Sequence, residues 1–282
     1  MPPAFLLAIT FLAPQEIQQG QVLRLTAPQA EPGLIAFFAG KDFPIFATNG
    51  RSLALIPVGV YQQPGAFPIT IKGPNGDVLQ QLPVIVKATD FPTQNIVATR
   101  QMKELKPLPG EVERMRSLAA TVSKDRHFED AFVLPVRGCR NSAFGVQRLH
   151  NGKPSGNYHR GVDQRGPEGT PIKAAASGMV AVAQPNFQLH GGTVGLDHGQ
   201  GLTSHYLHMS KVAVREGQRV NQGDVIGYVG STGFATGPHL HWGVNLHATP
   251  VNPTEFVKLT PCGAAKSPPA KRTRPPKKKP TP

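Results

Sequence analysis

The sequence is poor in cysteine, in charged residues and in long apolar runs. Its two cysteines, Cys139 and Cys262, exclude a disulfide framework and a CxxC metal site, and leave either one bridge or two buried thiols. No apolar run reaches the roughly 18 to 20 residues of a membrane-spanning helix, so we expect no transmembrane segment. Charged residues make up only 17% of the 282 residues, whereas Gly (30) and Pro (29) are frequent. This composition excludes a mainly helical bundle and favours short strands joined by turns.

The scarcity of acids leaves the chain basic, with 30 Lys and Arg against 17 Asp and Glu and a formal charge of +13. Seven of the positive charges lie in the Pro-rich stretch 266–282, so the rest of the chain carries only +6. The tail, residues 261–282, lacks apolar residues that could join a core, and we expect it to be disordered. It could bind anionic cell-surface polymers, or it could be no more than a solvated end.

Residues 1–14 form an apolar segment at the start of the chain. The run 4–13 has the length of the apolar core of a signal peptide, although no Lys or Arg precedes it. We interpret it as a signal for export to the periplasm, the cell envelope or the medium. The alternative is a first β-strand, or an apolar segment that packs on the following domain.

Residues 15–90 are predicted to form a small β-sandwich of immunoglobulin-like kind, since short apolar runs alternate there with turn residues. The stretch GPNG at 73–76 is a strong hairpin turn signal. The region contains no histidine, so we expect an accessory domain without a metal site. Residues 91–130 are predicted to be a linker, in which apolar residues at helical spacing indicate one helix over residues 111–122.

Residues 131–260 are rich in glycine and β-patterned, and nine of the ten histidines lie in this region. His239 and His241 are two residues apart on a predicted strand, so their side chains project from the same face and can reach one small region of space. His159 and Asp163 form a second cluster of the same chemistry. Imidazole and carboxylate ligands are typical of zinc, and three protein ligands with an open fourth position are typical of a catalytic zinc site.

A third histidine pattern lies at residues 203–208, which also alternate as a strand does. Regular strand geometry would place Tyr206 and His208 on one face and His205 on the other. Only one of the two faces can line a shared cleft. We therefore expect His205 to lie at the surface or to support the site residues, and not to be catalytic.

Five motifs in this region, in this order, resemble the LytM/lysostaphin-type zinc metallopeptidases of family M23, which cut the peptide parts of bacterial peptidoglycan. The motifs are HRGVD at 159–163, GTPI at 169–172, YLHMS at 206–210, GQRVNQGDVIGYVG at 217–230 and GPHLH at 237–241. The resemblance covers the whole of residues 131–260, and it implies an antiparallel-sheet peptidase domain with an open groove. It does not extend to the first domain or to the tail.

The resemblance implies a role for each matching position. His159, Asp163 and His241 would hold one zinc ion per chain. His208 and His239 match two family histidines that lie beside the metal without binding it. One would act as general base and the other would donate a hydrogen bond to the oxyanion, while zinc-activated water hydrolyses a peptide bond of peptidoglycan.

We also considered other functions against the sequence. A catalytically silent wall-binding protein that activates other wall hydrolases is the main alternative, and the presence of all five site positions argues against it. A lipoyl-like carrier is excluded because no lysine occupies the required turn in residues 217–230. A nucleic acid partner is not expected, since it would rest on the tail alone. The loops 184–192 and 231–238 are expected to form the walls of the groove.

Overall fold

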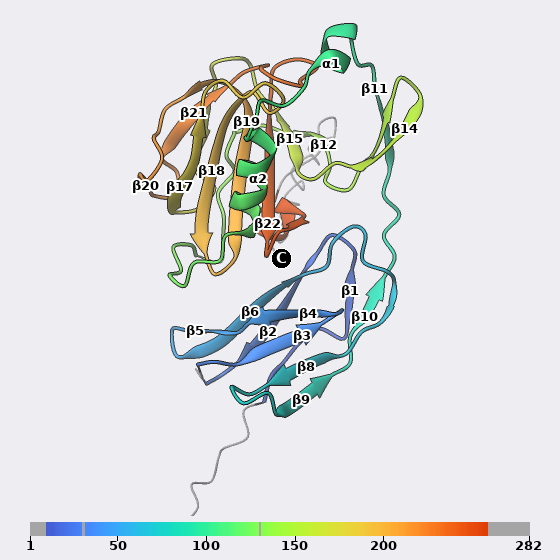
Figure 1. Ribbon diagram of the computed structural model, residues 1–282, viewed down its shortest axis with the longest axis vertical. Coiled ribbons are helices and arrows are strands. Elements are labelled where there is room, and N and C mark those ends of the chain that lie inside the picture. The colour runs from blue at the N-terminus through green and yellow to red at the C-terminus, as the bar shows by residue number, and fades with distance from the viewer. Residues whose placement is uncertain (1–9, 30–31, 130, 259–282) are drawn as a thin grey trace, which may run out of the picture.

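The structure is a computed structural model that describes residues 10–29, 32–129 and 131–258 (Figure 1). The fold is mainly β, as the sequence predicts, with a smaller first domain and a larger second domain. Among the described residues, no helix has the length and apolar character needed to cross a membrane. Cys139 is not a free thiol. The basic tail and Cys262 lie outside the described residues.

The first domain contains two sheets that enclose one core. Side chains alternate along their strands, so that Leu23 and Leu25 of one sheet and Ile69 and Ile71 of the other are buried together. The hairpin turn predicted at 73–76 is confirmed, because it joins β8 to β9. The sheets have the strand orders β2 (Val22–Ala27), β6 (Arg51–Pro57), β5 (Phe46–Thr48), and β4 (Lys41–Pro44), β3 (Ile35–Phe38), β8 (Ile69–Lys72), β9 (Val78–Leu82). The immunoglobulin-like strand order stays a prediction.

A third, small sheet closes the side of this domain. It consists of β1 (Glu16–Gln18), β10 (Ile85–Lys87) and β7 (Gly65–Ala66). Just before it, Phe11 is buried in the domain core and Leu12 bridges to Thr26. The described part of the apolar segment 1–14 therefore packs on the first domain, as the alternative interpretation expects, and residues 1–9 lie outside the described residues.

The second domain is built on a large antiparallel sheet, as the sequence predicts. Its core face buries Trp242, Tyr206 and Val162, and its opposite face carries the alternate side chains of the same strands. The central strand order is β12 (Arg140–Ser142), β15 (Val162–Arg165), β22 (His239–Leu246), β19 (Leu202–Val212), β18 (Gly192–Gly199), β17 (Gly178–Gln184), β20 (Arg219–Val220), with β16 (Pro171–Lys173), β21 (Val225–Val229) and β23 (Thr249–Val251) paired at its margins.

The linker between the domains contains more structure than the sequence predicts. The expected helix is α2 (Glu111–Ala120), which ends two residues early because Thr121 adopts an extended conformation. A short helix, α1 (Arg100–Glu104), and a strand, β11 (Thr93–Ile96), were not expected. Strand β11 pairs in parallel with β13 (Gln147–His150), which in turn pairs with β14 (Lys153–Tyr158).

Helix α2 covers part of the sheet face opposite the core. Leu118 packs there against Val182 and Phe187, and Gly195 beneath it leaves the space that Leu118 fills. The first domain contacts the core side of the second domain, where Val22 and Leu55 are buried in the same cluster as Trp242. Figure 1 shows the first domain facing the end of the sheet where β22 lies. The histidines lie on the sheet face opposite the core, on the part of it that β15 and β22 form.

Candidate active site

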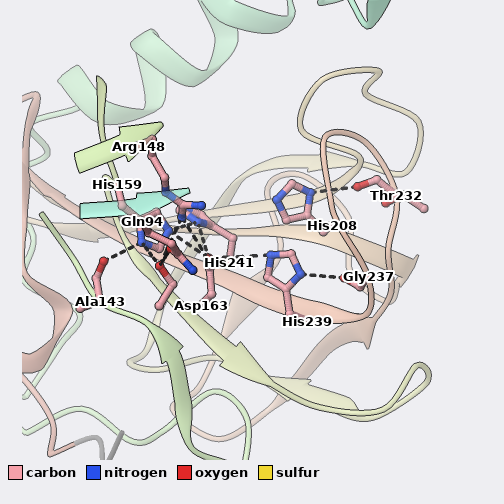
Figure 2. Close-up of polar contacts among 11 residues, drawn as sticks. Gln94, Ala143, Arg148, His159, Asp163, His208, Thr232, Gly237, His239 and His241 are labelled. Carbon is pink, nitrogen blue, oxygen red and sulfur yellow. Dashed lines mark hydrogen bonds and ion pairs between the residues drawn. The ribbon is translucent and has the colours of Figure 1, made fainter. Parts of the chain in front are cut away.

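Strands β15 and β22 bring three polar side chains to one point. Asp163 lies directly opposite His241 in the antiparallel register, so that both side chains project from the same face. His159 precedes β15 and completes the group. The atoms His159 Nε2, Asp163 Oδ1 and His241 Nδ1 lie 3.0 Å apart in each of the three pairs. Figure 2 shows them converging from the two strands and the preceding loop.

The three atoms suit a bound metal ion. His159 and Asp163 are buried, and His241 is half-buried. Zinc in proteins takes nitrogen and oxygen ligands at about 2.0 to 2.2 Å, and three atoms 3.0 Å apart can all lie at that distance from one ion. Among the described residues, this is the one group of three or more potential ligands that converges in this way. The donor set therefore fits the metal that the sequence predicts.

Backbone carbonyls orient three of the histidine rings in the same way. The Nδ1 atom of His159 lies 2.7 Å from Ala143 O, that of His208 lies 2.9 Å from Thr232 O, and that of His239 lies 2.8 Å from Gly237 O. A carbonyl oxygen only accepts, so each Nδ1–H donates, and the Nε2 of each neutral ring keeps a lone pair. These bonds fix the tautomer that metal binding and proton transfer both require.

His208 reaches the site through an irregular backbone. Its φ is 65°, which interrupts the alternation of β19 between Leu207, paired with His241, and Met209, paired with Val229. The side chain therefore turns toward His239, and the two ring centroids lie 5.0 Å apart. The Nε2 atom of His239 lies 3.8 Å from Asp163 Oδ1.

The same irregularity explains why the predicted face of His205 is wrong. Its neighbour Tyr206 is in the core, so His205 lies on the face that carries His241, with the two rings stacked at 5.6 Å. The side chain is 9% exposed and is therefore not at the surface. Gly243 opposite provides the space, because a Cβ there would lie 2.2 Å from the His205 ring.

The electrostatics of the site keep the carboxylate of Asp163 charged and the imidazoles of His208 and His241 neutral. Burial by itself would raise the pKa of Asp163, but the adjacent His159 and His241 hold this pKa well below its usual value. Burial lowers the pKa of His241 to about 4, although Asp163 opposes the shift, and burial lowers the pKa of His208 to about 3. Neutral imidazoles and one carboxylate are the protonation states of metal ligands.

Sequence reasoning missed three polar residues that support the site. Arg148 of β13 places Nη2 3.1 Å from Asp163 Oδ2, the carboxylate oxygen that faces away from the cluster. The Ser142 hydroxyl donates to Gln94 Oε1 at 2.8 Å and lies 3.2 Å from His159 Nδ1. Figure 2 shows Gln94 and Arg148 next to the histidines. None of the three belongs to a motif, and the pairing of β11 with β13 is what brings Gln94 to the site.

A cavity of about 480 Å³ opens onto the site. Both predicted wall loops contribute to it, with His190 from residues 184–192 and Phe234 from residues 231–238. Residues of β11 line the other side. The cavity therefore provides room for an extended ligand beside His239 and His241.

The first of these loops is held by an acid of the linker helix. The Glu111 carboxylate is fully buried and accepts from the backbone N–H groups of Gln188, Leu189 and His190 at 2.8 to 3.0 Å. It also accepts from His190 Nδ1 at 2.6 Å and from the backbone of Leu108. Burial acts to raise the pKa of Glu111, but the hydrogen bonds outweigh it and lower this pKa below its usual value. The carbonyl of His190 in turn accepts from the His208 backbone N–H at 3.0 Å.

Replacement of this acid should destabilise the protein. We expect Glu111→Ala to lower the free energy of unfolding by about 2 to 4 kcal/mol, because it leaves several buried N–H groups without an acceptor. Glu113→Ala, on the exposed side of the same helix, is the matched control and should change it by less than about 0.5 kcal/mol. Urea unfolding of the three proteins measures the difference. Equal midpoints for Glu111→Ala and Glu113→Ala would contradict the role of Glu111.

Comparisons with known proteins agree with this geometry. Residues 157–253 match the model of peptidase family M23. The DD-carboxypeptidase/endopeptidase Mpg of Neisseria meningitidis serogroup B is 38% identical over 143 residues, which are 47% of this chain and 33% of Mpg. The peptidoglycan DD-endopeptidase ShyA of Vibrio cholerae is 38% identical over 112 residues, which are 40% of this chain and 26% of ShyA.

A solved structure resembles most of the chain. The crystal structure assigned to peptidase M23 from Pseudomonas aeruginosa has 29% sequence identity and a TM-score of 0.66, covering 85% of this chain and 93% of that one. The chain spans about a third of the length of Mpg and about a quarter of that of ShyA. The family match contains all five predicted site residues and excludes β11, α2 and the first domain. Through its second domain, the chain belongs to peptidase family M23.

Proposed function

We propose that this protein is a zinc-dependent endopeptidase that hydrolyses peptide bonds in bacterial peptidoglycan and acts outside the cytoplasm. The observation that carries the proposal is the convergence of His159, Asp163 and His241, with His208 and His239 beside them. The name of ShyA supplies the substrate class, and that of Mpg also includes endopeptidase activity. The tail is not needed for this chemistry, and its binding to anionic polymers stays a prediction.

His159, Asp163 and His241 would hold the metal. Arg148 positions the Asp163 carboxylate through its second oxygen, and the Ala143 carbonyl keeps the lone pair of His159 Nε2 directed at the cluster. Zinc, when bound, lowers the pKa of water from about 15.7 to near 7 and polarises a carbonyl group. The remaining polar chemistry belongs to the two histidines beside the ligands.

His208 and His239 would move the proton. Because each Nδ1–H is donated to a carbonyl, each ring acts at Nε2, as an acceptor when neutral and as a donor after it has taken a proton. One ring can therefore accept the proton of the attacking water and pass it to the leaving amine. The other can donate to the oxyanion only after its Nε2 has taken up a proton from solvent, before the water attacks. The short distance between the rings allows both steps at one scissile bond.

Digestion of purified peptidoglycan by the full-length protein tests the proposal. We expect fragments to be released by the untreated protein, to be absent after treatment with a chelator and to return when zinc is added. Mass spectrometry of the fragments then identifies the bond. Failure of the zinc-loaded protein to release any fragment would contradict the proposal and favour the role of an activator of other hydrolases.

A further inference from the structure

A second cavity, of about 950 Å³, lies between the first domain, helix α2 and the sheet face that carries the site. The first domain contributes Lys41 and Tyr61, and the helix contributes Arg116. The sheet side is formed by the second domain, including His205 and Asn245. In Figure 1 this region lies where β3, β4 and α2 face the lower part of β22. The family match at residues 157–253 excludes two of these three walls.

The cavity continues into the one at the proposed zinc centre. The two share wall residues from both groove loops and from strands β19 and β22, namely Leu189, His190, Leu207, Phe234 and His241. A chain bound across the site can therefore extend from the cavity beside β11 into the interdomain cavity. His190 lies where the two cavities meet. Its Nδ1–H donates to Glu111, so its Nε2 atom can contact a ligand.

The interdomain cavity is lined by positive charge. Lys41, Arg116 and Arg160 all line it, and no Asp or Glu does so among the described residues. The structure gives these three side chains no ion-pair partner within the described part of the chain. All three are exposed and so remain solvated when the cavity is empty. Unpaired cations on one concave surface attract anions.

His205, which also lines the cavity, adds no charge of its own. Burial lowers the pKa of His205 well below its usual value, and the nearby His241, His190 and Arg160 act in the same direction. His205 is therefore neutral at pH 7.

An aromatic pair lies at the same place. Tyr61 of the first domain is 58% exposed, and its ring lies edge-on to Tyr158 with the centroids 5.2 Å apart. Both rings line the cavity. An exposed tyrosine next to unpaired cations offers an apolar surface and a hydroxyl to a chain that carries carboxylates. The basic tail of this protein, in contrast, would be repelled.

We propose that the interdomain cavity binds the carboxylate-bearing part of the peptide substrate, and that the first domain, through Lys41, thereby takes part in substrate selection. The inference rests on the proposed function, because the cavity is assigned to the same substrate as the site. Lys41 and Arg160 would pair with substrate carboxylates, while the bond to be cut lies at the histidines. The first domain is then a part of the substrate site.

Steady-state kinetics with a matched pair of substrates tests the inference. The probes are a purified cross-linked muropeptide with free carboxylates and the same muropeptide after chemical amidation. We expect Lys41→Gln and Arg160→Gln each to raise KM for the free-carboxylate probe by about threefold to tenfold, and to leave KM for the amidated probe unchanged. Added salt should raise KM for the free-carboxylate probe in the unmodified protein and should have less effect in the double variant.

Arg51→Gln and Lys153→Gln remove exposed charges outside both cavities and should behave like the unmodified protein. Fluorescence anisotropy with the labelled muropeptide and the His208→Ala protein measures binding without turnover. It therefore tests the cavity even if no bond is cut. Equal affinity of the Lys41→Gln/Arg160→Gln/His208→Ala protein and the His208→Ala protein for the free-carboxylate probe would overturn the inference. Equally tight binding of an oligonucleotide of the same charge would overturn the assignment to a peptide.

Discussion

Asp163→Ala should lose bound metal and, with it, peptidoglycan hydrolysis down to the level of a chelator-treated sample. The carboxylate is the only negative charge within the cluster of ligand atoms, and its oxygen lies 3.0 Å from both His159 Nε2 and His241 Nδ1. Without it, two imidazoles remain beside the cationic Arg148, which would oppose a divalent ion. Metal content by elemental analysis and fragment release from the same sample measure both effects.

The control for this change is Asp77→Ala, an exposed aspartate that follows the 73–76 turn of the first domain, which should keep metal and activity. Circular dichroism would show whether the Asp163→Ala protein is folded. A folded, metal-free Asp163→Ala protein that still cuts peptidoglycan would refute the ligand assignment, and with it the proposed chemistry.

His208→Ala should keep the metal and lose activity by about 10²- to 10⁴-fold, the range for removal of a general acid or base. The reason is that His208 Nε2 is not one of the three converging ligand atoms, yet its ring lies beside that of His239. His239→Ala should behave alike. The double variant should lose little more than either single variant, because the two rings act together on one scissile bond.

Metal content distinguishes this result from that for Asp163→Ala. We expect one zinc ion per chain in the His208→Ala and His239→Ala proteins, as in the unmodified protein. His127→Ala, in the linker, is the control for loss of an imidazole and should leave both the zinc content and the activity unchanged. Loss of zinc from the His208→Ala protein would show that this ring is a ligand, contrary to the proposal.

The sequence predicts the local features of this protein well. Regular alternation predicts the strand that carries His239 and His241, and short apolar runs separated by turns predict the mainly β fold. The five site positions follow from the motifs, and the structure places them together. These features depend on residues close to one another in the chain, where strand geometry and turn chemistry act directly.

Long-range pairing explains what the sequence could not predict. The φ of 65° at His208 arises where β19 changes partner from β22 to β21, so regular alternation assigned His205 to the wrong face. Glu111 looks like an ordinary exposed acid at the start of a helix, and its burial depends on a loop 77 residues away. Gln94 reaches the site because its strand pairs with β13, which begins only at Gln147, and no local pattern encodes this pairing.

The position of the linker also bears on where a recombinant fragment should begin. Cutting the chain at residue 131, where composition suggests that the second domain starts, would keep every motif residue of the site. It would also remove the outer strand of a three-stranded sheet, along with the carboxylate that receives three loop N–H groups. The smallest fragment suitable for enzymology therefore starts before Thr93, and a shorter one would expose β13 as an unpaired edge open to self-association.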